Sequence, residues 1–371
     1  MKFPWTVLLL AMLLIPSAGS TNNTHLPNDN TSLAYHRLEE GVINQRITHM
    51  DMPFTAQVTP EVRRMIRRFL VEGQLDSRYI LGRAAVYFPI FEHYLRLYNL
   101  PEELKYLPII ESSLRPAVQS PVGAAGLWQF VPETARLYGL KVNAQVDERL
   151  DPHRSTEAAV RMLASLYARF NDWGLALAAY NCGPGRVGRA VRQTAGKDYW
   201  AVQALLPKES QRYVPRFIAA AYLMNYYQTH ELQPRYPSDD MLHTRTFYLT
   251  QSLRLNTVAR RLGITYQTLT RLNPSYRHGQ VILHDGGAYL TVPTAVAPLF
   301  EQLFLNEQLT ALESTGTVAT YVTVAGDKLE TLAQLFQCSP ADIMRWNGLK
   351  EAKLTANQLL RIYLPQQVVQ P

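Results

Sequence analysis

Apolar residues recur with the period of an α-helix from about residue 57 to residue 227. One such helix is predicted to begin at Asp151 and Pro152, because aspartate suits the capping position of a helix and proline suits its first turn. Its apolar side chains recur at helical spacing, at Val160, Leu163, Leu166, Tyr167 and Phe170. No strand pattern is found in this region, so we expect a mainly α-helical domain.

The pattern changes beyond a proline-containing linker near residues 233–240. Short β-prone segments then flank helical stretches, at 246–250, 288–292, 321–324 and 359–364. Residues 255–274 align weakly with residues 329–348, and each stretch has helical spacing that leads to an asparagine, Asn273 or Asn347. We therefore predict that the C-terminal part contains a pair of small α+β units.

The N-terminal residues have the pattern of a secretory signal peptide. Lys2 supplies a positive charge, an apolar stretch runs from Trp5 to Ile15, and small residues follow, so we expect cleavage near Ala18 to Ser20. The apolar stretch is shorter than the roughly 20 residues that cross a bilayer, so we expect no integral membrane span. No cysteine follows this stretch directly, which argues against a lipid anchor. The mature chain is expected to act outside the cytoplasm.

At 371 residues the chain is longer than one hydrophobic core usually supports, so several compact units are expected. The segment after the signal is rich in Asn, Thr, Asp and Pro, and we expect a loose leader there. The predicted organisation is a signal peptide over 1–20, a leader over 21–55, a helical domain over 56–235, an α+β unit over 245–295, a helix and linker over 298–317, and a second α+β unit over 318–366.

Composition narrows the class of protein and of partner. Hydrophobic residues make up 47% and charged residues 18%, which is typical of a globular chain. The net charge of +7 and pI of about 9.3 favour an anionic partner, and nucleic acid, anionic lipid and cell wall all fit. The densest basic run, 63–68, alternates with apolar residues at helical spacing, which favours a solvated helix face. Without a nucleic-acid-binding fold pattern, we expect no nucleic acid partner.

The cysteines do not indicate a disulfide or a metal site. Cys182 and Cys338 fall in different predicted domains. Together with scattered histidines they do not match the spacing of a four-ligand zinc site. Cys182 has no close histidine partner, which favours a small core residue over a nucleophile. We expect no metal and no cofactor.

Glu111 is the most informative titratable residue. It directly follows the apolar run Leu107 to Ile110, so we expect its side chain to lie against apolar surface that raises its pKa. Such a carboxyl group can hold a transferable proton near neutral pH. An exposed glutamate at a helix end fits the local pattern equally well, because buried carboxylates are rare.

Side chains suited to a sugar follow in the sequence. Residues 123–126 form a small-residue turn that allows a backbone or a ligand to come close. Beyond it, the ring of Trp128 can stack on a pyranose, and the amide of Gln129 can donate to and accept from sugar hydroxyl and acetamido groups. Tyr180 and Asn181 lie at the end of a small-residue helix and are predicted to project polar groups into a cleft.

These segments together resemble the family 1 lytic transglycosylases of the goose-type lysozyme superfamily. The family pattern of Glu-Ser, Gly-Leu-Trp-Gln-Phe, Ala-Tyr-Asn and a tyrosine before Val-Pro is met, in order, by Glu111 and Ser112, by 126–130, by 179–181, and by Tyr213. The resemblance spans about residues 81–227. It implies a mainly α, lysozyme-like fold in which the glutamate lies in a deep glycan cleft.

The resemblance also implies a reaction on peptidoglycan. Glu111 would protonate the oxygen that links N-acetylmuramic acid to N-acetylglucosamine, and would then take a proton from the muramic 6-hydroxyl as it attacks C1. The product is a 1,6-anhydro sugar. Gln129, Asn181 and Tyr213 would hold the acetamido group, and Ser112 would orient Glu111. The substrate-binding set is Ser112, Trp128, Gln129, Tyr180, Asn181 and Tyr213.

Other functions remain open on the sequence alone. A goose-type lysozyme-like muramidase would use water in place of the 6-hydroxyl, with a second carboxylate to position it. The candidates for that carboxylate are Asp147, Glu148, Asp151 and Glu209. A catalytically inactive peptidoglycan-binding scaffold would retain only the wall-binding unit.

Residues 321–365 resemble the LysM carbohydrate-binding module, which implies a strand-helix-helix-strand fold that binds N-acetylglucosamine units. Gly326, Asp327 and Leu329 are the candidate glycan-binding residues. The earlier unit, over 245–295, is similar but lacks the Gly-Asp turn, so glycan binding and a purely structural role are both open for it. We expect a monomer that acts on peptidoglycan glycan strands in the periplasm of a Gram-negative bacterium.

Overall fold

A computed structural model of the chain describes residues 40–194, 198–249, 251–283, 288–305, 317–323, 327–336, 338–347, 349, 351–355 and 358–364. The predicted signal peptide and the first part of the leader lie outside the described residues. The chain divides into two compact units, Met1–Pro293 and Thr294–Pro371, each of which is described by itself.

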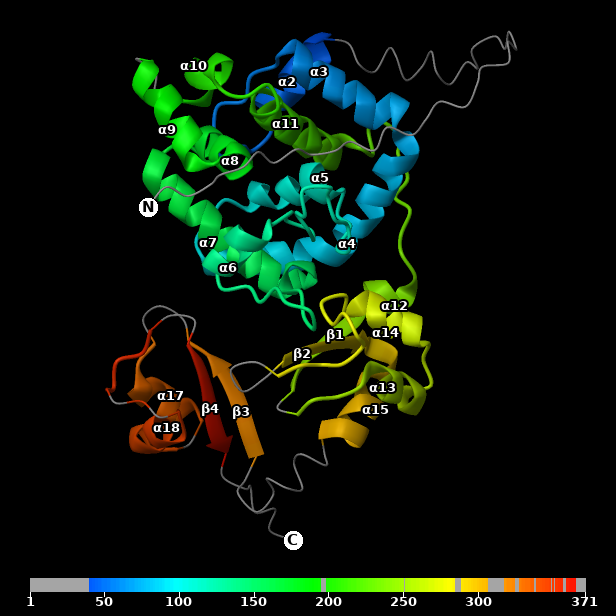
Figure 1. The fold of residues 1–371 in the computed structure, drawn as a ribbon, viewed down its shortest axis with the longest axis vertical. Coiled ribbons are helices and arrows are strands. Elements are labelled where there is room, and N and C mark those ends of the chain that lie inside the picture. Colours follow the sequence, from blue (N-terminus) through cyan, green and yellow to red (C-terminus); the bar gives the residue numbers. More distant parts are fainter. Residues whose placement is uncertain are drawn as a thin grey trace, which may run out of the picture. The chain divides into compact units, whose positions relative to one another are not determined.

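The first part of the N-terminal unit is helical, as the periodicity predicts (Figure 1). Its elements are α2 (Glu40–Thr48), α3 (Pro60–Arg67), η1 (Arg68–Glu72), α4 (Gln74–Leu97), η2 (Glu102–Tyr106), α5 (Leu107–Ser112), α6 (Pro132–Leu137), η3 (Glu148–Leu150), α7 (Pro152–Phe170), α8 (Trp173–Cys182), α9 (Pro184–Gln193), α10 (Tyr199–Val202), η4 (Gln203–Leu205) and α11 (Ser210–Tyr226). The predicted cap of α7 is present, since Asp151 Oδ1 accepts hydrogen bonds from the main-chain N–H groups of His153 and Arg154, both at 2.9 Å.

Helix α8 lies at the centre of this helical domain. Every residue from Trp173 to Cys182 is buried, because the helix is rich in alanine and leucine and packs against α7, α9 and α11. Asp172 caps its N-terminus by accepting a hydrogen bond from Leu175 N at 2.7 Å. Gly183, at φ +88°, ends it. The last turn of α8 therefore holds Tyr180 and Asn181 inside the domain.

The structure differs from the sequence prediction of a loose leader at its C-terminal end. Residues Glu40–Thr48 form helix α2, in which Ile43 and Ile47 are buried in the same core as the other helices. Arg46 donates a hydrogen bond to the Tyr222 hydroxyl at 2.9 Å, and its carbonyl accepts one from Tyr226 at 3.0 Å. This helix depends on contacts with α11, which a local polar composition does not reveal.

The remainder of the N-terminal unit is an α+β module. After the short α12 (Asp239–Leu242) come β1 (Thr244–Leu249), α13 (Leu255–Leu262), α14 (Tyr266–Leu272) and β2 (Ala288–Pro293). The strands pair antiparallel, from Thr244 opposite Pro293 to Leu249 opposite Ala288. Asn273, the asparagine found in both repeats, donates to the carbonyls of Leu269 and Thr291 and accepts from Thr291 N. Its role is to join α14 to β2.

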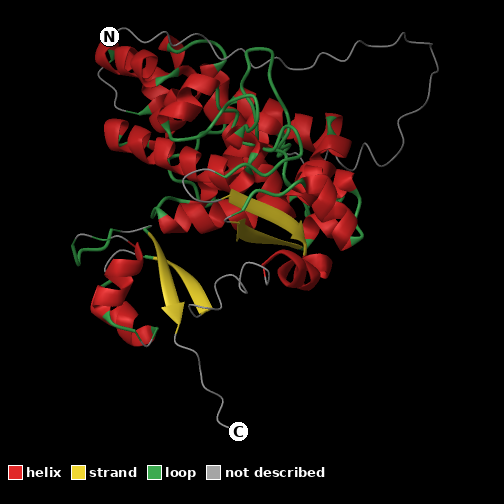
Figure 2. Cartoon of the chain, turned by 60° about the horizontal axis from the view of Figure 1, so that its bottom comes forward, coloured by secondary structure: helices red, strands yellow, loops and turns green. Residues whose placement is uncertain are grey.

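The C-terminal unit contains a second module with the same order of elements. After η5 (Thr294–Val296), α15 (Ala297–Phe300) and η6 (Glu301–Leu305) come β3 (Thr317–Val322), α17 (Leu329–Leu335), α18 (Pro340–Asn347) and β4 (Leu359–Leu364). Strands β3 and β4 pair antiparallel. Its core consists of Leu329, Leu332, Ala333, Ile343, Leu360 and Ile362. Within the described residues, the strands of both sheets belong to these modules (Figure 2), so the predicted fold class is confirmed.

Two further sequence expectations concern cysteines and membranes. Cys182 and Cys338 are both free thiols, and Cys182 is buried in the helical core. Among the helices in the described part of the chain, none combines the length and the apolar character needed to cross a membrane.

Candidate active site

Glu111 lies in the last turn of the short helix α5. Figure 1 shows α5 in the middle of the helical domain. The helix ends here because Ser113, the next residue but one, has the left-handed conformation, at φ +52°. Leu107 and Ile109 are buried around it, and α5 packs against α11. The side chain of Glu111 is held in this apolar setting with only 6% of its surface exposed. The exposed-glutamate alternative is therefore excluded.

The two oxygens of the Glu111 carboxyl group have different environments. The hydroxyl of Tyr213, on α11, donates a short hydrogen bond to Oε1. Oε2 is buried and has no hydrogen-bond partner among the described residues. Burial raises the pKa of Glu111 to about 7; the hydrogen bond from Tyr213 lowers it, the nearby charge of Glu209 raises it, and Arg216 lowers it. At neutral pH this carboxyl group can both give and take a proton.

The charge of Glu111 acts on two buried phenols, those of Tyr180 and Tyr213. Burial, together with the charge of Glu111, raises the pKa of each well above the ordinary value of tyrosine. Both therefore remain protonated as hydrogen-bond donors. Tyr180 donates to the carbonyl of Trp128 at 2.7 Å, which fastens α8 to the loop that precedes α6.

That loop, residues 123–130, adopts a conformation that few side chains permit. Gly126 has φ +86°, and a Cβ added there would lie 1.8 Å from the carbonyl oxygen of Arg149. Gln129 also has a left-handed backbone, at φ +50°, which is uncommon for a residue other than glycine. Its Nε2 donates to the carbonyls of Gly126 at 2.8 Å and Val118 at 3.3 Å. The amide nitrogen thus holds the loop together, and a sugar contact would have to come from Oε1.

Trp128 is not the stacking platform that the sequence predicted. Its side chain is 0% exposed and packs against Phe91 with the ring centroids 5.1 Å apart. Its Nε1 donates to the hydroxyl of Thr156 on α7 at 2.9 Å. Trp128 is a core residue that anchors the loop, because its fully buried indole ring has no exposed face to offer a sugar.

Ser112 also differs from its predicted role of orienting Glu111. Its hydroxyl donates to the carbonyls of Pro108 at 3.0 Å and Leu127 at 2.9 Å. Through these two hydrogen bonds Ser112 joins helix α5 to the loop 123–130. Ser112 therefore acts on the backbone that carries Glu111, and its proton is not directed to the carboxyl group.

Asn181 is held by a residue that the sequence reasoning missed. The hydroxyl of Ser210, the first residue of α11, donates to Asn181 Oδ1 at 2.6 Å. Because this bond uses the amide oxygen of Asn181, the Nδ2 group is the part of its side chain that can donate to a ligand. Ser210 lies next to Glu209 and three residues before Tyr213 on the same helix, a spacing that could have indicated a shared helix face. Cys182, beside Asn181, is buried and its pKa is raised by burial, which agrees with a core thiol.

The candidate residues of the second module are only partly described. Gly326 lies outside the described residues. Asp327 accepts a hydrogen bond from the Tyr321 hydroxyl at 3.0 Å. Leu329 is wholly buried in the core of the module, so the prediction that it touches glycan is wrong. Among the described residues of the whole chain, no cluster of three metal-ligating side chains is found.

Comparison with known proteins matches three segments of the chain to known domains. Residues 88–203 match the transglycosylase SLT domain, a range that includes Glu111, the loop 123–130 and Asn181. This part of the chain is a transglycosylase SLT domain. Residues 243–305 match the LysM-like domain of lytic transglycosylase MltD, and residues 321–362 match the LysM domain. The predicted family resemblance is confirmed.

Three curated proteins illustrate what the chain is similar to. The chain is 32% identical over 277 residues to membrane-bound lytic murein transglycosylase D of Escherichia coli K12, covering 71% of this chain and 60% of that protein. It is 32% identical over 155 residues to the soluble lytic murein transglycosylase of the same strain, covering 39% and 23%. A putative tributyltin chloride resistance protein of an Alteromonas strain is 40% identical over 100 residues, covering 27% and 48%.

Similar solved structures include the 70 kDa soluble lytic transglycosylase of Escherichia coli. It is 21% identical, with a TM-score of 0.36, over 53% of this chain and 43% of that chain. Its complex with bulgecin A matches at 21% identity and a TM-score of 0.36, over 57% and 38%. This chain spans about 60% of the length of the transglycosylase D relative.

Proposed function

We propose that the chain is a peptidoglycan lytic transglycosylase in which Glu111 is both the catalytic acid and the catalytic base. The observation that carries the proposal is a single glutamate, buried in the SLT domain, with a pKa of about 7 and a tyrosine hydroxyl on one of its oxygens. A general acid that later acts as a base is most efficient when its pKa lies near the working pH.

The two oxygens suggest how the proton moves. Tyr213 occupies Oε1, so Oε2, which has no partner in the described structure, is the atom suited to carry the proton. In the first step Oε2–H protonates the glycosidic oxygen as the bond from the muramic C1 to that oxygen breaks. In the second step the ionised carboxylate takes the proton of the muramic 6-hydroxyl as that oxygen bonds to C1. The 1,6-anhydro ring forms, and Glu111 is again protonated.

The intramolecular hydroxyl explains why one carboxylate is sufficient. Ordinary glycosidases place a second carboxylate opposite the acid, either as nucleophile or as the base that activates water. Here the attacking oxygen belongs to the substrate and already lies near C1. A second carboxylate is therefore not needed as a nucleophile or to activate water. The Nδ2 group of Asn181 and Oε1 of Gln129 are the polar groups left to hold the acetamido group, with Tyr213 beside the carboxyl.

A muramidase is the second candidate, and the position of Glu209 is the observation that favours it. The other three carboxylates considered for positioning water have structural roles elsewhere in the fold. Asp147 is paired with arginines, Glu148 accepts from Lys141 N at 2.7 Å, and Asp151 caps α7. Glu209 is the carboxylate whose charge acts on Glu111, by raising its pKa. In the transglycosylase proposal this charge helps to keep Glu111 protonated.

The C-terminal module is proposed to bind the peptidoglycan on which the site acts. We assign to residues 318–366 the binding of N-acetylglucosamine units, since residues 321–362 within this range match the LysM domain. A weak binding module tethered to the enzyme raises the local concentration of glycan. We further propose that the protein is exported to the periplasm and acts there as a monomer on peptidoglycan strands, without a nucleic acid partner or a cofactor.

The proposal is tested by digesting purified sacculi with the wild-type protein and with Glu111→Gln. The amide cannot transfer the proton, so we expect release of soluble fragments to fall by about a hundredfold or more. Binding to sacculi, measured by co-sedimentation, should be unchanged. The exposed Glu72→Gln is the matched control and should digest normally. Cleavage at an unchanged rate by Glu111→Gln would show that another residue is the acid.

A further inference from the structure

A buried ion network lies outside the reacting groups, at the contact between the SLT domain and the LysM-like module. Nε and Nη2 of Arg149 donate to the two oxygens of Asp147, both at 2.8 Å. Arg277, from the module, donates to Asp147 Oδ2 at 2.5 Å. The side chains of Asp147 and Arg149 are each 2% exposed, whereas that of Arg277 is 41% exposed. Burial would raise the pKa of Asp147, but the hydrogen bonds and charges of the arginines outweigh it and lower the pKa.

Arg149 connects this network to the loop that carries Gln129. Its Nη1 donates to the carbonyl of Gly123 at 2.6 Å and to the carbonyl of Phe130 at 3.0 Å, which are the two ends of the loop. Between them, Gly126 packs so closely on the main chain of Arg149 that no side chain fits. The planar guanidinium group can make all these bonds at once because its donors are fixed in one plane.

The LysM-like module holds the other side of the network through its backbone. Asp147 N donates to the carbonyl of Ser275 at 2.9 Å, and Arg277 N donates to the carbonyl of Gln145 at 3.1 Å. Val146 and Tyr276 form an antiparallel bridge between these bonds. Residues 145–147 and 275–277 thus pair like short strands. This pairing places the side chain of Arg277 beside Asp147.

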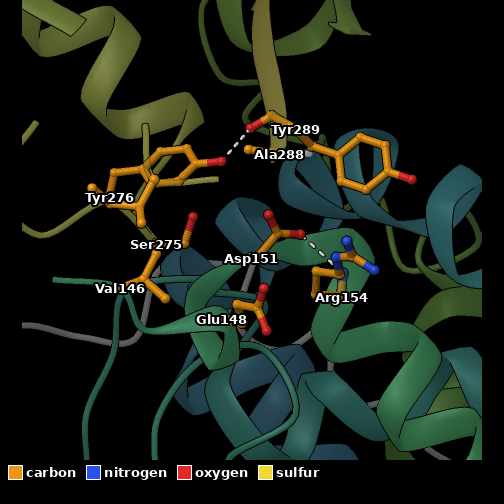
Figure 3. A pocket seen from close by; sticks show the side chains of 9 residues that line it. Val146, Glu148, Asp151, Arg154, Ser275, Tyr276, Ala288 and Tyr289 are labelled. Atoms are coloured by element: carbon orange, nitrogen blue, oxygen red, sulfur yellow. Dashed lines mark hydrogen bonds between the residues drawn. The ribbon is translucent and has the colours of Figure 1, made fainter. Parts of the chain in front are cut away.

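A small recess marks the same contact (Figure 3). Residues from both sides line it, with Glu148, Asp151 and Arg154 from the SLT side and Ser275, Tyr276 and Tyr289 from the module. In Figure 3 the Tyr276 hydroxyl points to the carbonyl of Tyr289, to which it donates at 2.6 Å. The guanidinium of Arg154 lies 4.9 Å from the centroid of the Tyr289 ring, a cation–π distance. None of the candidate substrate-binding residues lines this recess.

We infer that the LysM-like module positions the substrate loop of the SLT domain, and that Arg277 is a positioning residue that acts through Asp147 and Arg149 on residues 123–130. The inference gives a role to a module that lacks the Gly-Asp turn of its neighbour. It rests on the proposed function only for its activity measurement. Without the Arg277 guanidinium, Asp147 keeps Arg149 and its backbone bond to Ser275 but loses its side-chain link to the module, so the segment that carries Arg149 is less restrained and the loop moves more.

The test compares Arg277→Ala, Arg277→Lys and the control Arg260→Ala in the full chain. Arg260 is an exposed arginine on α13 of the same module, and the described structure gives it no ion pair. Hydrogen exchange of the main chain over 123–130 is measured for each variant, together with kcat and KM on a soluble glycan oligomer and with Tm. A soluble substrate removes the contribution of wall binding.

We expect Arg277→Ala to speed exchange over 123–130 and to lower kcat/KM by about fivefold. Arg277→Lys should recover part of both effects, and Arg260→Ala should match the wild type. Faster exchange confined to 144–147 and 275–278 would mean that the arginine only holds the module in place, and would overturn the inference. Faster exchange over 123–130 with unchanged kcat/KM would overturn it as well. If the wild type cleaves no glycan, the proposed function fails, and exchange over 123–130 then decides the inference by itself.

Discussion

The raised pKa of Glu111 has a consequence for stability that can be separated from catalysis. In the folded protein this pKa is about 7, against an ordinary value of 4.5. A difference of one pKa unit corresponds to about 1.4 kcal/mol, so keeping Glu111 ionised in its buried site costs about 3 kcal/mol of folding free energy. Replacement by glutamine removes this charge while its amide oxygen can still accept the hydrogen bond from Tyr213.

The sign follows from where the proton resides. Below pH 4.5 the carboxyl is protonated in both states and stability does not depend on it. Between pH 4.5 and about 7 the folded state keeps a proton that the unfolded state releases, so the contribution to stability falls as pH rises. Above pH 7 Glu111 is ionised in both states, and the folded state bears the full cost of the buried charge. The new amide N–H of Glu111→Gln has no partner at the Oε2 position and costs about 1 kcal/mol at every pH.

The variant should therefore be about 1 kcal/mol less stable than the wild type at pH 4 and about 2 kcal/mol more stable at pH 8. Urea unfolding followed by tryptophan fluorescence measures the difference, because Trp128, Trp173 and Trp200 all report on the helical domain. Glu72→Gln, at an exposed position, should show no such pH dependence. A stability difference between Glu111→Gln and the wild type that is the same at both pH values would refute the buried, proton-holding glutamate.

Three further changes test other contacts. Tyr213→Phe removes the hydrogen bond that lowers the pKa of Glu111, so the alkaline limb of the pH–rate profile should move to higher pH; a shift to lower pH would contradict the assigned contact. Trp128→Phe loses the hydrogen bond to Thr156 and should cost about 1–3 kcal/mol of stability in urea unfolding, with KM on a soluble oligomer unchanged; a large rise in KM would restore the ring as a sugar platform. A chain that ends at Glu313 lacks the LysM domain and should digest insoluble sacculi more slowly, with soluble oligomers cut at the normal rate; equal losses on both would mean that the domain supports the catalytic fold instead.

Much of the fold could be predicted because the pattern is local. Helix α7 shows its cap and its apolar stripe within its own sequence, and the two modules show alternating strand and helix signals. Glu111 was placed among apolar neighbours because Leu107 to Ile110 precede it directly. Its burial then depended on α11, which lies about a hundred residues further on, and for that reason the local pattern left its exposure open.

The errors arose where a long-range contact determines what a side chain does. Trp128 was predicted to stack on sugar, but Phe91 and Thr156, which are distant in sequence, enclose it. The Ser112 hydroxyl was expected to serve Glu111, but it bonds to the carbonyl of Leu127 across the loop. Asp147 and Arg149 gave no local signal of an arginine network, because the third member comes from the module.

The most direct test of the central claim is the mass of the fragments that the wild-type protein releases from purified sacculi. If Glu111 assists attack by the muramic 6-hydroxyl, the muramic ends are 1,6-anhydro sugars, one water lighter than reducing sugars. This result is predicted for the wild type and should disappear with Glu111→Gln. Reducing muramic ends from the wild type would contradict the account, because water and not the 6-hydroxyl would then be the attacking group.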